Sequence, residues 1–173
     1  MSSMAALQAA NLYQRYLTLL NPTIANTVTT TVAASWVDIE IAIQHYDACE
    51  HMELPAAQLI AMGEQVGAQI QGTFIATLAK ANREKTVSPW VFLSQFGRLW
   101  QRLFQGGAVS VWSKREREAV LEVSELSLVR FAYFRYAFIG VMHACFKIVG
   151  ARFYNTRVLN TVNDNCTYQL TWK

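Results

Sequence analysis

The amino-acid sequence predicts an α+β domain, with N-terminal helices and one long C-terminal helix packed on one face of a four-stranded antiparallel sheet made of two hairpins. Three observations predict this class. Helical periodicity dominates the first hundred residues, strand-like alternation comes in two pairs, and a long apolar helix separates the pairs. At 173 residues the chain suits one domain, 1–173, with a helix-plus-polar-loop arm over 1–35 and a core over 36–173.

The N-terminal region contains one clear helical pattern and one ambiguous pattern. Residues 5–20 repeat apolar side chains at helical spacing, and Asn21-Pro22 is expected to end this helix because the residue before proline avoids the α region. Residues 21–35 are rich in Thr and Asn and carry no charge, which predicts a loop or a short extended piece. Residues 37–44 alternate like a strand, yet the apolar positions that follow favour a helix from about Val37.

The next helix is expected from Pro55 to about Asn82, although it contains Gly63, Gly67 and Gly72. Each glycine in a helix interior costs about 1 kcal/mol relative to alanine. Close packing against another helix explains these glycines better than a ligand contact does.

Capping signals and alternation define the rest of the chain. Ser88-Pro89 opens a helix that Gly106-Gly107 ends. One long apolar helix covers 131–149, with Gly140 and Ala144 forming a notch of small residues on one face. The expected strands are residues 108–112, 119–123, 153–161 and 166–172.

Composition excludes several protein classes. Hydrophobic residues make up 53% of the chain and charged residues 16%, which argues against disorder. The net charge is −5 over residues 1–79, +3 over 80–127 and +5 over 128–173. Attraction between the two halves of the molecule, or across a dimer, explains this asymmetry better than a basic binding face, because the basic residues are scattered. We therefore expect no nucleic-acid partner.

The cysteines and the apolar segments indicate a cytoplasmic protein. Three cysteines at unrelated spacings do not form a secreted disulfide framework. The N-terminus lacks the basic and apolar regions of a signal peptide. The most apolar stretch, residues 136–146, is too short for a transmembrane segment, which needs about 20 residues.

The sequence shows little equipment for catalysis or metal binding. Its three histidines are His45, His51 and His143, and it contains none of the Walker, GxGxxG, HExxH or GxSxG motifs. We predict no catalytic residue, no metal site and no cofactor. His143 could serve as the proximal ligand of a haem, but a histidine satisfied within the core is the simpler interpretation.

Short signatures over residues 34–173 resemble the vinyl-4-reductase-like superfamily of small-ligand-binding domains, and most closely a bacterial family of unassigned role within or beside it. The signatures are Ala34-Ser-Trp36, His45-Tyr46, the glycine-bearing helix 54–78, Pro89-Trp90, the segment 99–107, Tyr133-Phe-Arg135 and Tyr168-Gln-Leu-Thr-Trp172.

The resemblance implies helices on an antiparallel sheet, frequent dimerisation and, in some relatives, an apolar pocket for small molecules or acyl chains. The paired cysteines of some vinyl-reductase domains are absent here. Transport-complex relatives carry a cysteine that can be acylated, and whether Cys49 or Cys145 corresponds to it stays open.

These observations favour a non-enzymatic sensory or binding module that holds a small apolar ligand between the helices and the sheet. A ligand-free dimeric adaptor is the alternative, and a hydrolytic or redox enzyme is less favoured. We expect a homodimer, with Trp112 and Trp172 near its seam. The expected residues of the ligand pocket are Trp36, His45, Tyr46, Trp100, Tyr133, Arg135 and His143.

Overall fold

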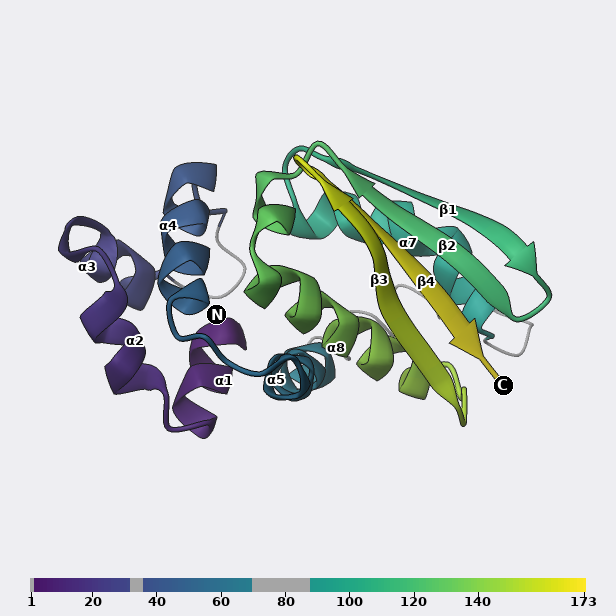
Figure 1. The fold of residues 1–173 in the computed structure, drawn as a ribbon, viewed down its shortest axis with the longest axis horizontal. Coiled ribbons are helices and arrows are strands. Elements are labelled where there is room, and N and C mark those ends of the chain that lie inside the picture. Colours follow the sequence, from purple (N-terminus) through teal and green to yellow (C-terminus); the bar gives the residue numbers. More distant parts are fainter. Residues whose placement is uncertain (1, 32–35, 70–87) are drawn as a thin grey trace.

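The computed structural model describes residues 2–31, 36–69 and 88–173. Figure 1 shows an open four-stranded antiparallel sheet with helices on one side of it, so the expected α+β class is confirmed. The strand order is β1-β2-β4-β3, which places the two hairpins side by side.

Each hairpin is formed by strands that are adjacent in the sequence. The first joins β1 (Ala108–Arg115) to β2 (Glu118–Ser124), and the second joins β3 (Tyr154–Val162) to β4 (Asn165–Trp172). The pairing of β2 with β4 unites the hairpins into one sheet.

Alternation in the last strand separates an apolar face of the sheet from a polar one. Cys166, Tyr168 and Leu170 are completely buried and oppose apolar residues of β2. On the other face Gln169 donates a hydrogen bond to Glu118 and accepts one from Arg157. The outer face is therefore polar and hydrogen-bonded around Gln169, but Trp112, 44% exposed, lies on the same face in register with Val120. Trp172 lies on the buried side, at only 8% exposure, rather than near a seam on the outer face.

Two helices cover the apolar face. Ser88 caps α7 (Pro89–Leu103), and a short 3-10 turn, η1 (Ser127–Arg130), leads into α8 (Ala132–Ile148). Both helices contribute aromatic side chains to the core against the sheet, including Phe92, Trp100 and Phe146.

A second hydrophobic cluster lies on the far side of α8. It is built by α1 (Ser2–Ala9), α2 (Tyr13–Leu19), α3 (Pro22–Thr30), α4 (Ile39–Glu50) and α5 (Ala56–Gln69). Figure 1 shows these helices at the end of the molecule away from the β1–β2 turn, with α5 next to α8.

The single helix expected over residues 5–20 is wrong. The chain breaks between α1 and α2, where Asn11 takes a positive φ of 57°. The break turns α2 so that Tyr16 and Leu20 are buried with Leu7 in the second cluster. Tertiary burial therefore overrides a continuous helical pattern.

The loop expected over 21–35 is also wrong where the structure describes it, because residues 22–30 form α3. The side chain of Asn21 accepts a hydrogen bond from the backbone N–H of Thr23, and Pro22 takes the first helical position. Ile24 and Val28, four residues apart, are the buried positions that hold this polar helix. The rest of the expected loop, 32–35, lies outside the described residues.

The ambiguous segment after it is a helix, as expected. The carboxylate of Asp38 accepts from the N–H of Glu40 and caps α4, which begins at Ile39. The helix expected from Pro55 is described as α5 up to Gln69, so its remainder and Gly72 lie outside the described residues.

The glycines of α5 and α8 allow their backbones to touch, which confirms the expected close packing. A Cβ built on Gly63 would overlap the carbonyl of Ala137, and one built on Gly140 would overlap the carbonyl of Ile60. A Cβ on Gly67 would lie 2.5 Å from that of Ala144. None of the described helices has the length and hydropathy to cross a bilayer.

Candidate functional site

An apolar cavity of about 300 Å³ lies among the helices. Its size is at the lower end of the range for small-molecule sites, about 300–1,000 Å³. The lining comes from α1, α4, α5, α7 and α8 and from the residue after α7, and consists of Ser3, Ala6, Tyr46, Met62, Gly63, Val66, Phe96, Leu99, Arg102, Leu103, Phe104, Tyr133, Phe134, Ala137, Phe138, Val141 and Cys145.

Helix geometry explains why this cavity exists. The glycine contacts bring α5 and α8 together along one line, and α7 leaves the pair to cover the sheet. The stacked rings of Trp100 and Phe104, 4.3 Å between centroids, hold the end of α7 against Phe134 and Phe138. Aromatic rings held in this way resist collapse into a small void.

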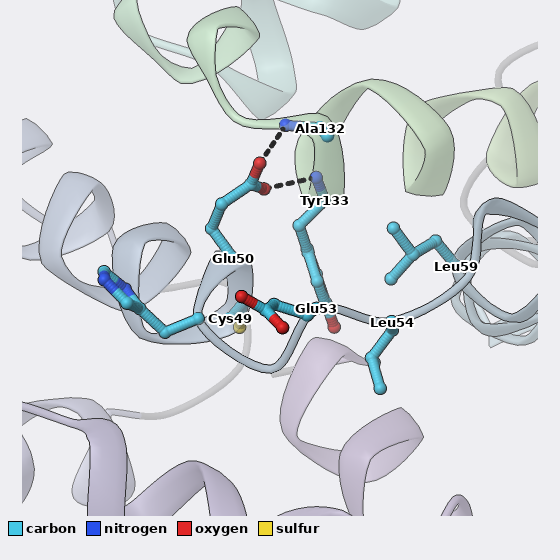
Figure 2. A pocket seen from close by; sticks show the side chains of 8 residues that line it. Cys49, Glu50, Glu53, Leu54, Leu59, Ala132 and Tyr133 are labelled. Atoms are coloured by element: carbon cyan, nitrogen blue, oxygen red, sulfur yellow. Dashed lines mark hydrogen bonds between the residues drawn. The ribbon is translucent and has the colours of Figure 1, made fainter.

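A second, more open pocket of about 520 Å³ lies at the junction of α4, α5 and α8 (Figure 2). Both carboxylate oxygens of Glu50 accept hydrogen bonds there, from the backbone N–H of Ala132 at 3.1 Å and from that of Tyr133 at 2.8 Å. These are unpaired donors at the start of α8, so Glu50 caps that helix from another element. The open pocket is thus a structural junction.

Tyr133 lines both the open pocket and the apolar cavity. Its side chain is buried, contacts the ring of Tyr46 at 6.0 Å between centroids, and forms a hydrogen bond with the thiol of Cys49. Burial raises the pKa of Tyr133 above its ordinary value, so the phenol stays protonated. The uncharged ring of Tyr133 therefore lies between the two pockets.

A buried polar cluster centred on His45 lies next to Tyr133. The hydroxyl of Tyr16 lies 2.7 Å from Nδ1 of His45, and the Sγ atom of Cys49 lies 3.8 Å from Nε2. Burial lowers the pKa of His45 to about 4 and raises that of the Cys49 thiol. Both groups are therefore neutral near pH 7, so the cluster holds no activated nucleophile.

Of the seven residues expected in a ligand pocket, Tyr46 and Tyr133 line the apolar cavity. Trp36 is 55% exposed, and His45 belongs to the buried polar cluster described above. Trp100 lies against the lining rings Phe96, Phe104 and Phe138, and its buried Nε1 finds no partner among the described residues.

The last two expected residues serve other contacts. The Arg135 guanidinium donates to the carbonyls of Val129 and Arg130 and fixes the turn before α8. Nδ1 of His143 lies 3.3 Å from the carboxylate of Glu64, which also accepts from Lys147 at 2.6 Å. His143 thus joins α8 to α5 away from the cavity lining.

The sequence did not single out most of the cavity lining as a site. Val66, Phe96 and Leu99 follow helical periodicity, and that pattern predicts core residues whether or not a void lies beside them. The glycine pattern was the one available signal, since Gly63 lines the cavity and sets the spacing of α5 and α8.

No protein-family model matches the sequence, and no curated protein matches it. The fold is shared with solved structures. An Fe(II) unliganded H-NOX protein from K. algicida matches with a TM-score of 0.71 and 8% identity, over 99% of this chain and 93% of that chain. A structure described as modulating haem redox potential through porphyrin distortion matches with a TM-score of 0.58 and 11% identity, over 99% and 92%.

A third match is a trafficking protein particle complex subunit 3 from Naegleria fowleri, covalently bound to palmitic acid. Its TM-score is 0.53 and its identity 17%, over 99% of this chain and 95% of that chain. At these identities the likeness establishes a common fold.

The donor atoms around the apolar cavity do not fit a haem. Iron in haem takes an axial histidine, thiolate, phenolate or methionine paired with histidine. None of the three histidines lines the cavity. Burial raises the pKa of the Cys145 thiol to about 12, so this lining residue is a thiol near pH 7, and the lining phenols Tyr46 and Tyr133 also have raised pKa values.

Proposed function

We propose that the protein is a non-enzymatic binding module for a small apolar molecule, held in the apolar cavity between α1, α5, α7 and α8. The observation that carries the proposal is the lining, which is almost entirely aliphatic and aromatic. Such a lining favours a ligand that binds by burial of apolar surface, with few polar contacts.

The shared fold supports this proposal. Solved proteins with this fold are described as bound to palmitic acid in one case and as a haem protein in another. The donor set here favours an apolar molecule without a metal, such as an acyl chain or an aromatic compound. The resemblance to vinyl-4-reductase-like domains implies the same class of ligand and stays a prediction.

Two measurements test the proposal. Native mass spectrometry of freshly purified protein, followed by organic extraction, should show a lipid or an aromatic compound bound to the chain. The apolar dye N-phenyl-1-naphthylamine should gain fluorescence when it binds the protein, because the cavity excludes water.

A matched pair of variants locates the binding. Val66→Phe places a ring in the cavity and should weaken dye binding about tenfold or more, since a filled cavity leaves no room for the dye. Val162→Phe makes the same change at a site that is 52% exposed and should bind like the wild type. Absence of any bound compound and of dye binding, or an equal effect of both variants, would contradict the proposal.

The dimeric adaptor remains a second candidate because of an apolar patch at the start of α4. Trp36, Val37 and Ile39 are each more than a third exposed. We propose that this patch contributes to a homodimer. Sedimentation equilibrium should then show a wild-type dimer that Ile39→Glu converts to a monomer, whereas a monomeric wild type would remove this candidate.

A further inference from the structure

Five basic side chains gather at one end of the sheet. They come from the end of β1 and the turn after it, from the residue two positions before β3 and from the residue after β4, and all five are exposed. We call this group the basic end of the sheet, and its members are Lys114, Arg115, Arg117, Arg152 and Lys173.

Backbone hydrogen bonds hold these three segments side by side. The N–H of Trp172 donates to the carbonyl of Arg117 at 3.2 Å, and that of Arg152 donates to Lys173 at 3.3 Å. The N–H of Lys173 donates to the carbonyl of Phe153 at 2.8 Å. Figure 1 shows the β1–β2 turn, the end of β4 and the beginning of β3 at the same end of the sheet.

The basic end carries an excess of positive charge. Residues 113–118, 152–155 and 171–173 contain only two acidic side chains, those of Glu116 and Glu118. Glu118 lies 3.7 Å from Nε of Arg115, whose side chain is 85% exposed and so remains available to a partner. Three acidic residues, Glu40, Asp47 and Glu50, lie on α4, which is at the opposite end of the molecule.

An exposed aromatic residue, Phe153, lies next to Arg152 of the basic end. Phe153 is 69% exposed, the highest value among the large apolar side chains of the described residues. Its neighbour Trp172 is buried, stacks on Phe146 at 5.7 Å and meets Trp90 at 5.0 Å. Trp90 in turn donates from Nε1 to the carbonyl of Glu116 at 2.7 Å. The exposed Phe153 therefore lies in the chain next to a strand end whose own aromatic residues are packed together.

We propose that the basic end of the sheet docks on the surface of an anionic lipid bilayer, with Phe153 inserted between the headgroups. Basic clusters gain free energy from the negative surface potential of such a bilayer, and an aromatic ring adds apolar burial at the interface. Single-stranded nucleic acid fits less well, because it stacks successive bases on several exposed rings. Here Trp90 and Trp172 are engaged with each other, which leaves Phe153 and Trp112 as the exposed rings near the basic end.

Flotation with lipid vesicles tests this proposal independently of ligand binding in the cavity. The full chain should float with vesicles of phosphatidylcholine and phosphatidylserine and should not float with phosphatidylcholine alone. Raising the salt concentration to about 1 M should release the protein, because the screening length falls to about 3 Å.

Paired variants separate the basic end from general charge. The double variant Lys114→Gln/Arg117→Gln should weaken vesicle binding roughly 25-fold, at roughly fivefold for each cation removed. Arg15→Gln/Arg98→Gln removes the same charge from exposed sites on α2 and α7 and should retain most of the binding. Phe153→Ala should weaken binding, whereas Val162→Ala, at the other end of β3, should not.

Three results would overturn the proposal. They are equal binding to both kinds of vesicle, equal loss in the two double variants, and an unchanged affinity of Phe153→Ala together with insensitivity to salt. Gel-shift titration with a single-stranded oligonucleotide adds a fourth result. Binding to it that exceeds vesicle binding and is lost in Lys114→Gln/Arg117→Gln would assign the basic end to nucleic acid.

Discussion

At the scale of single residues, His45 shows how burial sets the charge of a side chain. Nδ1 of its ring shares a hydrogen bond with the hydroxyl of Tyr16, Nε2 faces the Sγ atom of Cys49, and both partners stay neutral near pH 7. No carboxylate compensates a positive charge on this ring in the contacts that the structure describes. The neutral form is therefore the form that the fold stabilises.

This arrangement predicts loss of stability in mild acid. The unfolded ring takes up a proton below its ordinary pKa of 6.5, whereas the folded ring does so only near its lowered pKa of about 4. The unfolded state then binds more protons, so the free energy of unfolding should fall between these two pH values by up to about 3 kcal/mol. Urea denaturation over this range measures the slope.

Two variants isolate the contribution of His45. His45→Gln removes the titrating ring and should flatten the slope, and His51→Gln, at the exposed end of α4, is the matched comparison outside the core. Burial also lowers the pKa of His143, so part of the slope should persist in His45→Gln. An identical slope in His45→Gln and the wild type would show that His45 is not the source.

Glu50 gives a second prediction at this scale. Its carboxylate satisfies two N–H groups at the start of α8, so Glu50→Gln should lower the free energy of unfolding by about 1–2 kcal/mol. Denaturant unfolding measures the loss. Glu53→Gln in the same pocket changes an exposed carboxylate and should have little effect, so equal losses would argue against the capping role.

At the scale of the helices, the contact of α5 with α8 depends on glycines that leave no room for a methyl group. Gly63→Ala and Gly140→Ala should each destabilise the fold by about 1–3 kcal/mol, because either Cβ would meet a backbone carbonyl of the facing helix. Thermal unfolding measures both effects.

Gly97 provides the control for this prediction. It lies on the exposed face of α7, and a Cβ at this position would meet no atom of a neighbouring element within 4 Å. Gly97→Ala should therefore stabilise the protein by up to about 1 kcal/mol, because alanine favours the helix. If all three variants shifted the melting temperature alike, helix propensity rather than interhelical contact would explain the result.

The helices also show what local sequence can and cannot predict. Gly63, Gly67 and Gly140 indicated close packing because glycine weakens a helix interior unless a neighbouring backbone needs the space. The break at Asn11 could not be predicted, since it depends on which residues the second cluster buries, so tertiary contacts decide that case. The helix from Pro22 to Thr30 did have a local signal, the Asn21 cap and the proline after it, but burial of Ile24 and Val28 holds its otherwise polar sequence in the helix.

At the scale of the whole molecule, the sheet was predictable because alternation in residues 166–172 is uninterrupted and the turns are polar. The cavity was not, because it results from the relative positions of α5, α7 and α8. Trp36 and His143 are polar or aromatic residues that resemble site residues in sequence, yet one is exposed and the other bridges two helices.

The whole fold should hold an apolar ligand but no axially ligated haem. Haemin added to the purified protein should give no sharp Soret band, since the cavity lining offers no histidine and no thiolate. Leu99→His places an imidazole on the lining and serves as the positive control for iron ligation. A sharp Soret band with the wild type would contradict this prediction.

The touching backbones of α5 and α8 also bear on how a ligand could enter and leave the apolar cavity. Two helices packed carbonyl to glycine cannot slide or separate without losing their contact, so we expect that side of the cavity to stay closed while a ligand binds. Among the described elements, exchange with solvent then falls to α1 and to the end of α7, where Leu103 is half exposed. For the ligand proposed above, the residence time should therefore depend on the opening of α1 and of the end of α7, while the α5–α8 pair limits which ligand shapes fit.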